Sequence, residues 1–506
     1  MKAVAGLLAA LTLLSGCGVK PTDYPLAAGQ ANAVQAPLDV APDHPFVVMT
    51  FSGGGSRAAA LAAAVVRRLN DLHYTAGGES RALSQDIAVV SSVSGGSVYA
   101  ADLGLNGPAH AASFMQRVQD YDGIGWLARR FLNPVTWLSL QFESETRIAV
   151  LQEMIEDLLQ TKATMAALNK PSGQLTLLNA TDMVAGQVFT FDRQTLDDVC
   201  MDYDRVPVSL GVTASAAFPF AFTPVLLHND SYLQPMCPGQ RNPSLPYLAT
   251  LQSVSGPYAN LESYRTARYR QSLRDEVVVE QGSGDKVPPY RNPVYLRLVD
   301  GGVADNSGLT ALRRALLQTG APADIGRLAA QSRLRHLVVI AVNARSDPKS
   351  GLDNSTQYTT ILTQANAISG TLVDSASSYS AAVFQDFIKL LINDRDTLVL
   401  QDGQTQANFA VYPISIDFDQ LPNATAAERQ QQEAVKSIAT SWTLKPGDVK
   451  LLDAAAGELL WRHPCFRLLV SDIGLQGQAE APAIPGLRCP VEPPVQIPAK
   501  SRRPPA

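Results

Sequence analysis

The chain has 506 residues, of which 46% are hydrophobic and 17% are charged. This composition is typical of a globular protein with a sizeable apolar core, and it excludes a chain that is disordered throughout. The formal net charge of -5 gives no sign of the basic surface that nucleic-acid-binding proteins use, so we expect no nucleic-acid partner.

The first residues have the pattern of a bacterial export signal. Lys2 precedes an apolar run over residues 3–14, and Leu14-Ser15-Gly16-Cys17 follows it. The run is too short to cross a bilayer. The Leu-Ser-Gly-Cys segment resembles the lipobox of bacterial lipoproteins, which implies that residues 1–16 are removed and that Cys17 is lipidated. A plain cleaved signal peptide is the alternative.

Residues 17–43 are rich in Pro, Ala and Gly without periodicity, which is typical of a tether between an anchor and a folded body. The lipoprotein resemblance predicts a protein of the bacterial envelope that contacts the membrane through its lipid anchor. Because Gly18 rather than Asp follows Cys17, the same resemblance implies the outer membrane.

Four further cysteines lie in a chain whose predicted compartment permits oxidation. We favour the pairs Cys200 with Cys237 and Cys465 with Cys489, because these close the shorter loops, and four free thiols are the alternative. Neither the cysteines nor the six histidines have metal-ligand spacing, so we expect no metal site.

From about residue 44, short apolar runs alternate with helical patterns, which predicts an α/β domain with a mainly parallel sheet flanked by helices. A first helix is expected from about Arg57 to Leu72, where one apolar stripe faces the core. The predicted strands are Phe46–Phe51, Ile87–Ser92, Leu175–Ala180, Val188–Phe191, Tyr295–Val299 and Leu337–Val342.

Two irregular stretches, at about 229–293 and 347–440, are predicted insertions in a single domain that spans residues 44–465. The first contains a basic-aromatic cluster within residues 264–274, for which a solvated helix is favoured over contact with anionic headgroups. The second contains plausible helices at Ala381–Leu391 and Ala426–Ile438. Residues 466–506 are predicted to form a Pro-rich tail.

A glycine-rich turn, Ser52-Gly53-Gly54-Gly55-Ser56-Arg57, joins the first predicted strand to the first helix. Consecutive glycines let the backbone approach a ligand, and the helix N-terminus adds positive potential. The turn predicts binding of an anion or a developing oxyanion. A dinucleotide loop through Gly53, Gly55 and Ala58 and a plain flexible turn are alternatives.

A second turn, Ser92-Val93-Ser94-Gly95-Gly96, follows the next predicted strand and precedes a short helix. Such a strand-turn-helix elbow exposes a nucleophile when small residues lie two positions before and after it. Ser92 and Gly96 meet this demand, although glycine is commoner than serine at the first position. A Ser/Gly-rich loop is the alternative.

A third segment, Asp300-Gly301-Gly302, follows the strand Tyr295–Val299. A carboxylate followed by two glycines suits a strand end that presents an acid while the backbone turns away. Asp-Gly also marks ordinary hairpin turns, so this string alone predicts little.

Together, in this order and spacing, the three segments resemble the patatin-like phospholipases, and more distantly the catalytic domain of cytosolic phospholipase A2. The resemblance in sequence extends to Ala214–Pro219, to Asp300–Leu309 and to the expected helix Leu444–Leu460. The resemblance implies a three-layer fold and a serine acyl hydrolase that cleaves phospholipids or other acyl esters without a cofactor.

The resemblance also implies the role of each site residue. Ser94 is the nucleophile, Asp300 is its base in a dyad without histidine, and Arg57 supports the loop or contacts a phosphate headgroup. The N–H groups expected to hold the oxyanion belong to Gly53, Gly54, Gly55 and Gly95.

Three alternatives remain at this point. A Ser-Asp-His triad of Ser94, Asp300 and His336 is a rival mechanism. A catalytically silent lipid-binding or envelope-scaffold lipoprotein is a rival function. A dinucleotide-dependent oxidoreductase needs an acidic residue about twenty positions after the glycines, and Glu79 is the nearest candidate.

Overall fold

The structure is a computed structural model. It describes residues 21–136, 146–230, 293–345 and 408–476, apart from 28–29, 31, 170–172, 220 and 319, together with 269–270, 272–273, 382–393, 395 and 489. Within this part of the chain no helix is long and apolar enough to span a bilayer.

A mixed, mostly parallel sheet forms the centre of the fold, in the order β10-β9-β1-β4-β5-β8-β7, with β6 paired to β5. The strands from β10 to β5 are parallel, whereas β6, β7 and β8 pair in antiparallel fashion. The sheet strands are β1 (Phe46–Phe51), β4 (Ile87–Val93), β5 (Leu175–Asp182), β6 (Gln187–Thr190), β7 (Val225–His228), β8 (Tyr295–Asp300), β9 (His336–Asn343) and β10 (Ala410–Asp417). A separate hairpin consists of β2 (His73–Ala76) and β3 (Glu79–Ala82).

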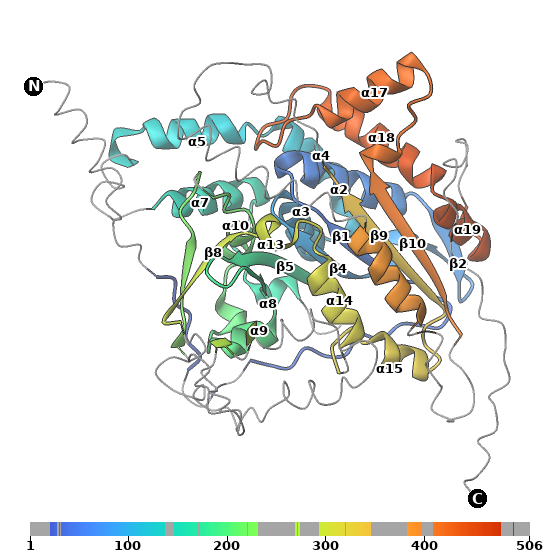
Figure 1. The fold of residues 1–506 in the computed structure, drawn as a ribbon, viewed down its shortest axis with the longest axis horizontal. Coiled ribbons are helices and arrows are strands. Elements are labelled where there is room, and N and C mark those ends of the chain that lie inside the picture. The colour runs from blue at the N-terminus through green and yellow to red at the C-terminus, as the bar shows by residue number, and fades with distance from the viewer. Residues whose placement is uncertain are drawn as a thin grey trace, which may run out of the picture.

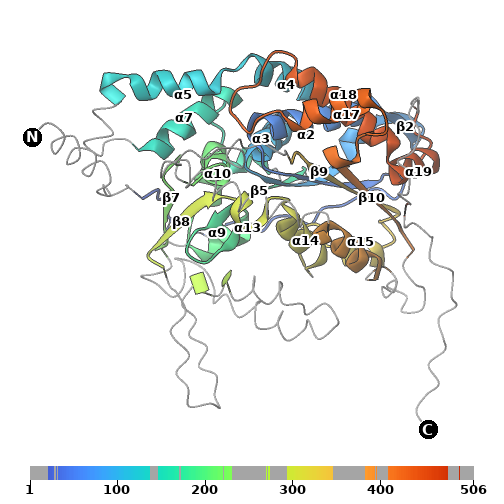
Figure 2. The same cartoon turned by 45° about the horizontal axis from the view of Figure 1, so that its top comes forward.

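Helices cover both faces of this sheet, which makes the fold a three-layer α/β arrangement, as predicted (Figure 1, Figure 2). One face carries α2 (Gly55–Asn70), α3 (Gly95–Asn106), α4 (Ala111–Asp120), α5 (Gly123–Leu132), α7 (Arg147–Leu159), α8 (Met165–Leu168), α10 (Val208–Ser215), α18 (Asp448–Arg462) and α19 (Pro464–Asp472). The other face carries α14 (Leu309–Leu317), α15 (Ile325–Ala330) and helical residues 382–393. The remaining helices are α9 (Arg193–Asp198), α13 (Gly302–Asp305) and α17 (Ala426–Lys436).

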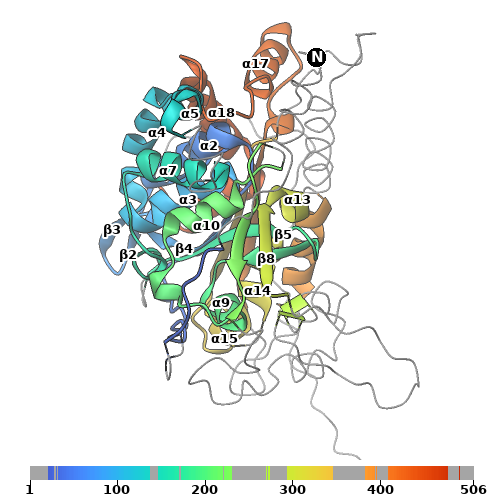
Figure 3. The same ribbon diagram turned by 90° about the vertical axis from the view of Figure 1, so that its left-hand side faces the viewer.

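The alternation of β1 explains why both faces are covered. Val47, Met49 and Phe51 pack into the core beneath α2, whereas Phe46 and Val48 pack into the core beneath α14 and α15. A strand with apolar side chains on both sides must be buried on both sides, which is the usual state of a parallel sheet. Figure 3, viewed from the β7 end of the sheet, shows α2, α4 and α7 together on one side of the strands.

The N-terminal segment differs from its prediction as a free tether. Thr22 N–H donates to Leu226 O at 2.7 Å, and His228 N–H donates to Thr22 O at 3.0 Å, so this segment extends the β7 edge. Leu38 and Val40 are buried against the α14 face. The tether prediction is therefore wrong for the described part of residues 21–40. Cys17 and the signal segment lie outside the described residues.

Two further boundaries differ from the sequence prediction. The expected insertion at about 347–440 includes β10, which pairs with β9 along its whole length. The expected tail begins too early, because α19 continues to Asp472 and buries Phe466 and Leu469 in the core.

The disulfide between Cys465 and Cys489 is confirmed, and it joins residues 24 positions apart. Cys200 is also disulfide-bonded, but Cys237, its predicted partner, lies outside the described residues.

Removal of the Cys465–Cys489 bond should lower the free energy of unfolding by about 3 kcal/mol, because the bond limits the conformations of the unfolded chain. We expect urea unfolding of the double variant Cys465→Ser/Cys489→Ser to report this loss. The single variant Cys465→Ser should lose a similar amount. A loss in the double variant of less than about 1 kcal/mol would contradict the entropic account.

Candidate active site

Ser94 lies in a strained turn directly after β4 and is the N-cap residue of α3. Its backbone has φ 51° and ψ −125°, a conformation that residues other than glycine rarely adopt. Such strain typically costs about 1–3 kcal/mol and persists where the surrounding structure holds it in place. Ser94 thus lies in the strand-turn-helix geometry that the sequence predicts at this point.

The two glycines after Ser94 allow α3 to approach the glycine-rich loop closely. A Cβ atom on Gly95 would lie 2.0 Å from Gly55 O, and one on Gly96 would lie 2.6 Å from Ser52 O. No side chain fits at either position without moving backbone atoms. Close packing therefore explains why glycines occupy both positions.

Asp300 lies beside Ser94 because of the register of three strands. Val93 of β4 is paired with Asn179 of β5, and Ala180 of β5 is paired with Asp300 at the end of β8. Although β8 runs antiparallel to β5, it pairs only with the last three residues of β5, so its own last residue lies level with the end of β4. There Ser94 Oγ donates a hydrogen bond to Asp300 Oδ2 at 2.7 Å.

The carboxyl group of Asp300 is buried, with the whole residue 4% exposed. Burial raises the pKa of Asp300 to about 6, while hydrogen bonds from the Gly302 N–H and the Ser94 hydroxyl act in the opposite direction. A carboxylate with a pKa near 6 is a stronger base than one near 3.9. Asp300 is thus suited to accept a proton from Ser94 near neutral pH.

Hydrogen bonds among buried polar residues, whose partners the sequence did not indicate, fix the elbow. Ser215 Oγ accepts a hydrogen bond from Ser94 N–H at 2.8 Å and donates to Asn179 O at 2.6 Å. Ser92 Oγ, at the position where glycine is commoner, lies 3.0 Å from Ser97 Oγ. The Ser92 hydroxyl is therefore accommodated at this position by a hydrogen bond.

The glycine-rich loop lies next to this elbow, but its first glycine is already engaged. Gly53 N–H donates to both Asn306 Oδ1 and Asn306 O, at 3.2 and 3.3 Å. The prediction of Gly53 as an oxyanion donor is therefore wrong for this conformation. Within the described chain, the N–H groups of Gly54, Gly55 and Gly95 have no hydrogen-bond partner.

Arg57 supports the loop from inside the protein. Its side chain donates to Ala344 O at 2.9 Å, to Thr440 Oγ1 at 3.0 Å and to Ile438 O. Arg57 is 2% exposed, which leaves no room for a headgroup contact, the other alternative for this residue. Residues 438–440 fall within the predicted insertion at about 347–440. The structure shows that residues 438–441 instead hold the glycine-rich loop in place.

Two other sequence alternatives lie far from Ser94 in the fold. His336 begins β9 at the amino-terminal edge of the parallel strands, where its Nδ1 lies 3.2 Å from the Tyr412 hydroxyl oxygen. This excludes the triad that includes His336. Glu79 is exposed in the β2–β3 hairpin, outside the main sheet, so it is not placed as a dinucleotide loop requires.

The basic-aromatic cluster is described only at residues 269–270 and 272–273. Arg270 Nε donates to Asp198 Oδ2 at 2.5 Å, and the Tyr269 hydroxyl donates to Asp182 Oδ2 at 3.3 Å. Both side chains are buried, so the solvated helix predicted here is wrong for these two residues. The other members of the cluster lie outside the described residues.

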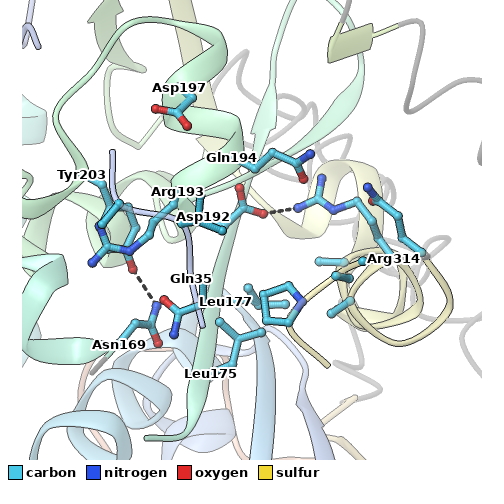
Figure 4. Close-up of a pocket in the computed structure, with 18 residues that line it drawn as sticks. Gln35, Asn169, Leu175, Leu177, Asp192, Arg193, Gln194, Asp197, Tyr203 and Arg314 are labelled. Carbon is cyan, nitrogen blue, oxygen red and sulfur yellow. Dashed lines mark hydrogen bonds and ion pairs between the residues drawn. The ribbon is translucent and has the colours of Figure 1, made fainter. Parts of the chain in front are cut away.

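A cavity of about 270 Å³ lies on the α14 side of the sheet, apart from Ser94 and Asp300 (Figure 4). Leu175 and Leu177 line its base, and Arg193 stacks on the ring of Tyr203 at its wall. Arg314 is paired with Asp192 on the opposite side. The cavity shares no residue with the predicted site.

One cluster departs from the expectation that no metal-ligand set exists. Ligand atoms of Asp23, His228 and Asp230 lie within 4.8 Å of one another at the β7 edge. His228 Nδ1 and Asp230 Oδ1 already share a hydrogen bond at 2.7 Å. This group is distant in the sheet from the Ser94 edge and has no part in the chemistry discussed below.

Comparison with known proteins gives one family match. Residues 49–235 match the family model described as patatin-like phospholipase. No curated protein matches.

Among solved structures, human GIVD cytosolic phospholipase A2 is 10% identical, with a TM-score of 0.42. The match covers 85% of this chain and 60% of that one. VipD from Legionella pneumophila is also 10% identical, with a TM-score of 0.25 and coverage of 88% and 73%. The chain thus spans about three fifths of the length of the phospholipase A2 structure.

The backbone strain at Ser94 predicts an unusual order of stability. We expect Ser94→Gly to be about 1 kcal/mol more stable than Ser94→Ala, because both lose the hydroxyl but only glycine relieves the strain. At Ser97, inside α3, the order should reverse, because glycine destabilises a helix. Urea unfolding of the four variants tests this, and a less stable Ser94→Gly would exclude strain at this turn.

The pKa of Asp300 predicts how its replacement changes stability with pH. The folded-state pKa is raised, so ionisation of Asp300 destabilises the native state as the pH rises from about 4 to above 6. Asn carries no charge. The stability of Asp300→Asn relative to the wild type should therefore increase by up to about 3 kcal/mol between pH 4 and pH 7.5.

Asp122→Asn serves as the control for that experiment. The Gly125 N–H lowers the pKa of Asp122, so its charge stabilises the native state at higher pH, and its relative stability should move in the opposite direction. Chemical unfolding at several pH values measures both trends. Equal behaviour of the two variants would show that Asp300 does not have a raised pKa.

Proposed function

Because residues 49–235 match the patatin-like phospholipase family, we propose that this protein is a serine hydrolase that cleaves acyl esters of lipids. The observation that carries the proposal is the 2.7 Å hydrogen bond from Ser94 Oγ to the buried carboxylate of Asp300. A serine hydroxyl becomes an effective nucleophile only when a base takes its proton.

In the proposed reaction, Ser94 Oγ attacks the ester carbonyl carbon while Asp300 Oδ2 accepts the hydroxyl proton. The proton then passes to the leaving alcohol as the ester C–O bond breaks, which leaves an acyl group on Ser94. Water enters, loses a proton to Asp300 and attacks the acyl-enzyme. The fatty acid leaves, and Ser94 regains its proton.

The oxyanion of each tetrahedral intermediate needs hydrogen-bond donors that are in place before the reaction begins. We assign this role to the N–H groups of Gly54, Gly55 and Gly95, which lack partners in the described chain and lie where α2 and α3 begin. Each such donor typically contributes about 3 kcal/mol to the transition state. The positive ends of both helices act in the same direction.

Arg57 is a positioning residue in this scheme. Its guanidinium group holds the backbone of residues 344 and 438, and Ser56 N–H donates to Ser441 O at 2.8 Å. These contacts keep the loop fixed against the elbow. Preorganised donors are effective because they do not have to reorient during the reaction.

The proposal includes attachment to the bacterial envelope through a lipidated Cys17, which is supported by the lipobox-like sequence at residues 14–17. Stable anchoring by lipid requires more than one acyl chain, as bacterial lipoproteins carry. An anchored enzyme would meet acyl esters that are themselves held in a membrane.

A fluorophosphonate probe tests the nucleophile. We expect it to label the wild type and to leave Ser94→Ala unlabelled, because the probe reacts with activated serine hydroxyls. The labelling rate should rise with pH around a midpoint near 6, since Asp300 accepts the proton only when it is ionised. Asp300→Asn should label at least about a hundredfold more slowly.

Ser84→Ala is the matched control, because Ser84 is also a buried, hydrogen-bonded serine but has no contact with the elbow. A folded wild type without labelling would favour the catalytically silent lipid-binding protein. Defined phospholipids, lysolipids, neutral glycerides and short-chain esters then identify the substrate. Cleavage of short-chain esters alone would replace a lipase-type activity with a general esterase.

A further inference from the structure

The helix α5 exposes a row of apolar side chains to solvent. Ile124, Leu132 and Val135 are 49%, 81% and 73% exposed, and the exposed Ala128 lies between the first two. Positions 124, 128 and 132 are spaced at i, i+4 and i+8, so they share one face of the helix. We call Ile124, Ala128 and Leu132 of α5, together with Val135 just beyond its end, the α5 stripe. Figure 1 and Figure 2 both show α5 at the outer rim of its layer.

Attachment of α5 to the protein does not need this stripe. Leu127 is buried on the inward side, where Trp126 and Phe131 also pack against the core. A helix on the surface of a globular protein normally has polar residues on its outer face. An outward apolar row on a helix that already has an inward one indicates a binding surface.

The charge of α5 differs from that of the chain as a whole. Its sequence, GIGWLARRFL, contains two arginines and no acidic residue, in a chain of net charge -5. Arg129 has a side chain that is 72% exposed and lies 4.0 Å from the exposed Asp122. Arg130 pairs with Glu153. Exposed apolar residues beside a cation are typical of helices that lie in the headgroup region of an anionic bilayer.

The first turn of α5 is tied to the segment that holds the glycine-rich loop. Gly123 N–H donates to Trp442 O at 3.2 Å, and Ile124 N–H donates to Thr443 Oγ1 at 2.9 Å. The neighbouring Ser441 O accepts from Ser56 N–H at 2.8 Å. Residues 441–443, which span roughly 10 Å at most, thus connect the first turn of α5 to the glycine-rich loop.

We propose that the α5 stripe inserts into the surface of an anionic lipid bilayer and holds the Ser94 site next to it. The docking itself depends on the stripe and on Arg129, whereas its benefit to catalysis rests on the proposed function. Docking through the stripe would bring the bilayer to the helix whose first turn is linked to the glycine-rich loop through residues 441–443. A protein partner or a second copy of the chain is the competing occupant of the same surface.

Vesicle binding of the full chain tests this proposal, in a Cys17→Ala background so that no acyl anchor contributes. The probe is phosphatidylcholine vesicles with and without about one third phosphatidylglycerol. We expect Ile124→Gln/Leu132→Gln to bind the anionic vesicles at least about tenfold more weakly than the parent. Arg129→Glu should lose the preference for anionic over neutral vesicles.

The matched control is Val383→Gln/Leu451→Gln, which changes two exposed apolar side chains on other helices. It should bind vesicles as the parent does. Hydrolysis of a monomeric short-chain p-nitrophenyl ester should stay within about twofold for every variant, because none of these residues touches the site, and thermal melting should confirm the fold. Hydrolysis of vesicle lipid should fall together with binding.

Equal vesicle binding by the stripe variant and the parent would overturn the proposal. A stripe variant that changed from dimer to monomer in analytical ultracentrifugation, without a change in vesicle binding, would assign the surface to a second copy. If the wild type bound vesicles through the stripe but cleaved no ester, the proposed function would fail while the docking surface remained.

Discussion

The position of β5 between β4 and β8 determines whether Ser94 and Asp300 can meet. These residues are 206 positions apart in the chain, and their hydrogen bond requires the parallel register of β4 on β5 and the antiparallel register of β8 on β5 together. If either pairing shifted by one residue, the side chains of the shifted strand would point to the opposite face of the sheet, and Ser94 and Asp300 would no longer meet. Asn179 strengthens this arrangement, since its side chain bonds to Ser92 O and its carbonyl accepts from Ser215.

The same site contains two unfavourable features, a backbone turn at positive φ and a buried carboxylate. Both lie at one edge of the sheet beside the start of α3, where Phe51, Val93 and Tyr99 are completely buried. Strain and desolvation of a few kcal/mol persist in a native state only when a larger packed region fixes the geometry. The raised pKa of Asp300 is therefore a consequence of the same packing that positions Ser94.

Most of the sheet could be predicted from apolar runs, because β1, β4, β5 and β9 are buried on both faces, whereas β8 alternates between exposed and buried residues before its buried end. The strand β10 was missed since Pro413 interrupts its apolar run, and proline usually argues against a strand. It is tolerated here because β10 lies at the edge of the sheet. Ser94, Asp300 and the glycines carried local signals. Asn306 and Ser215 lie in segments that resemble the family, but their partners are 253 and 121 positions away, so the local sequence does not predict what they contact.

The hydrogen bonds between residues 438–441 and the loop at residues 53–57 affect the order in which the site can form during synthesis. Arg57 and Ser56 find their partners only after the chain has been extended to residue 441. The elbow and Asp300 can pair earlier, since both precede that segment. A growing chain can therefore form the Ser94–Asp300 hydrogen bond long before its glycine-rich loop is held in place, and the arrangement is complete only after nearly the whole polypeptide has emerged.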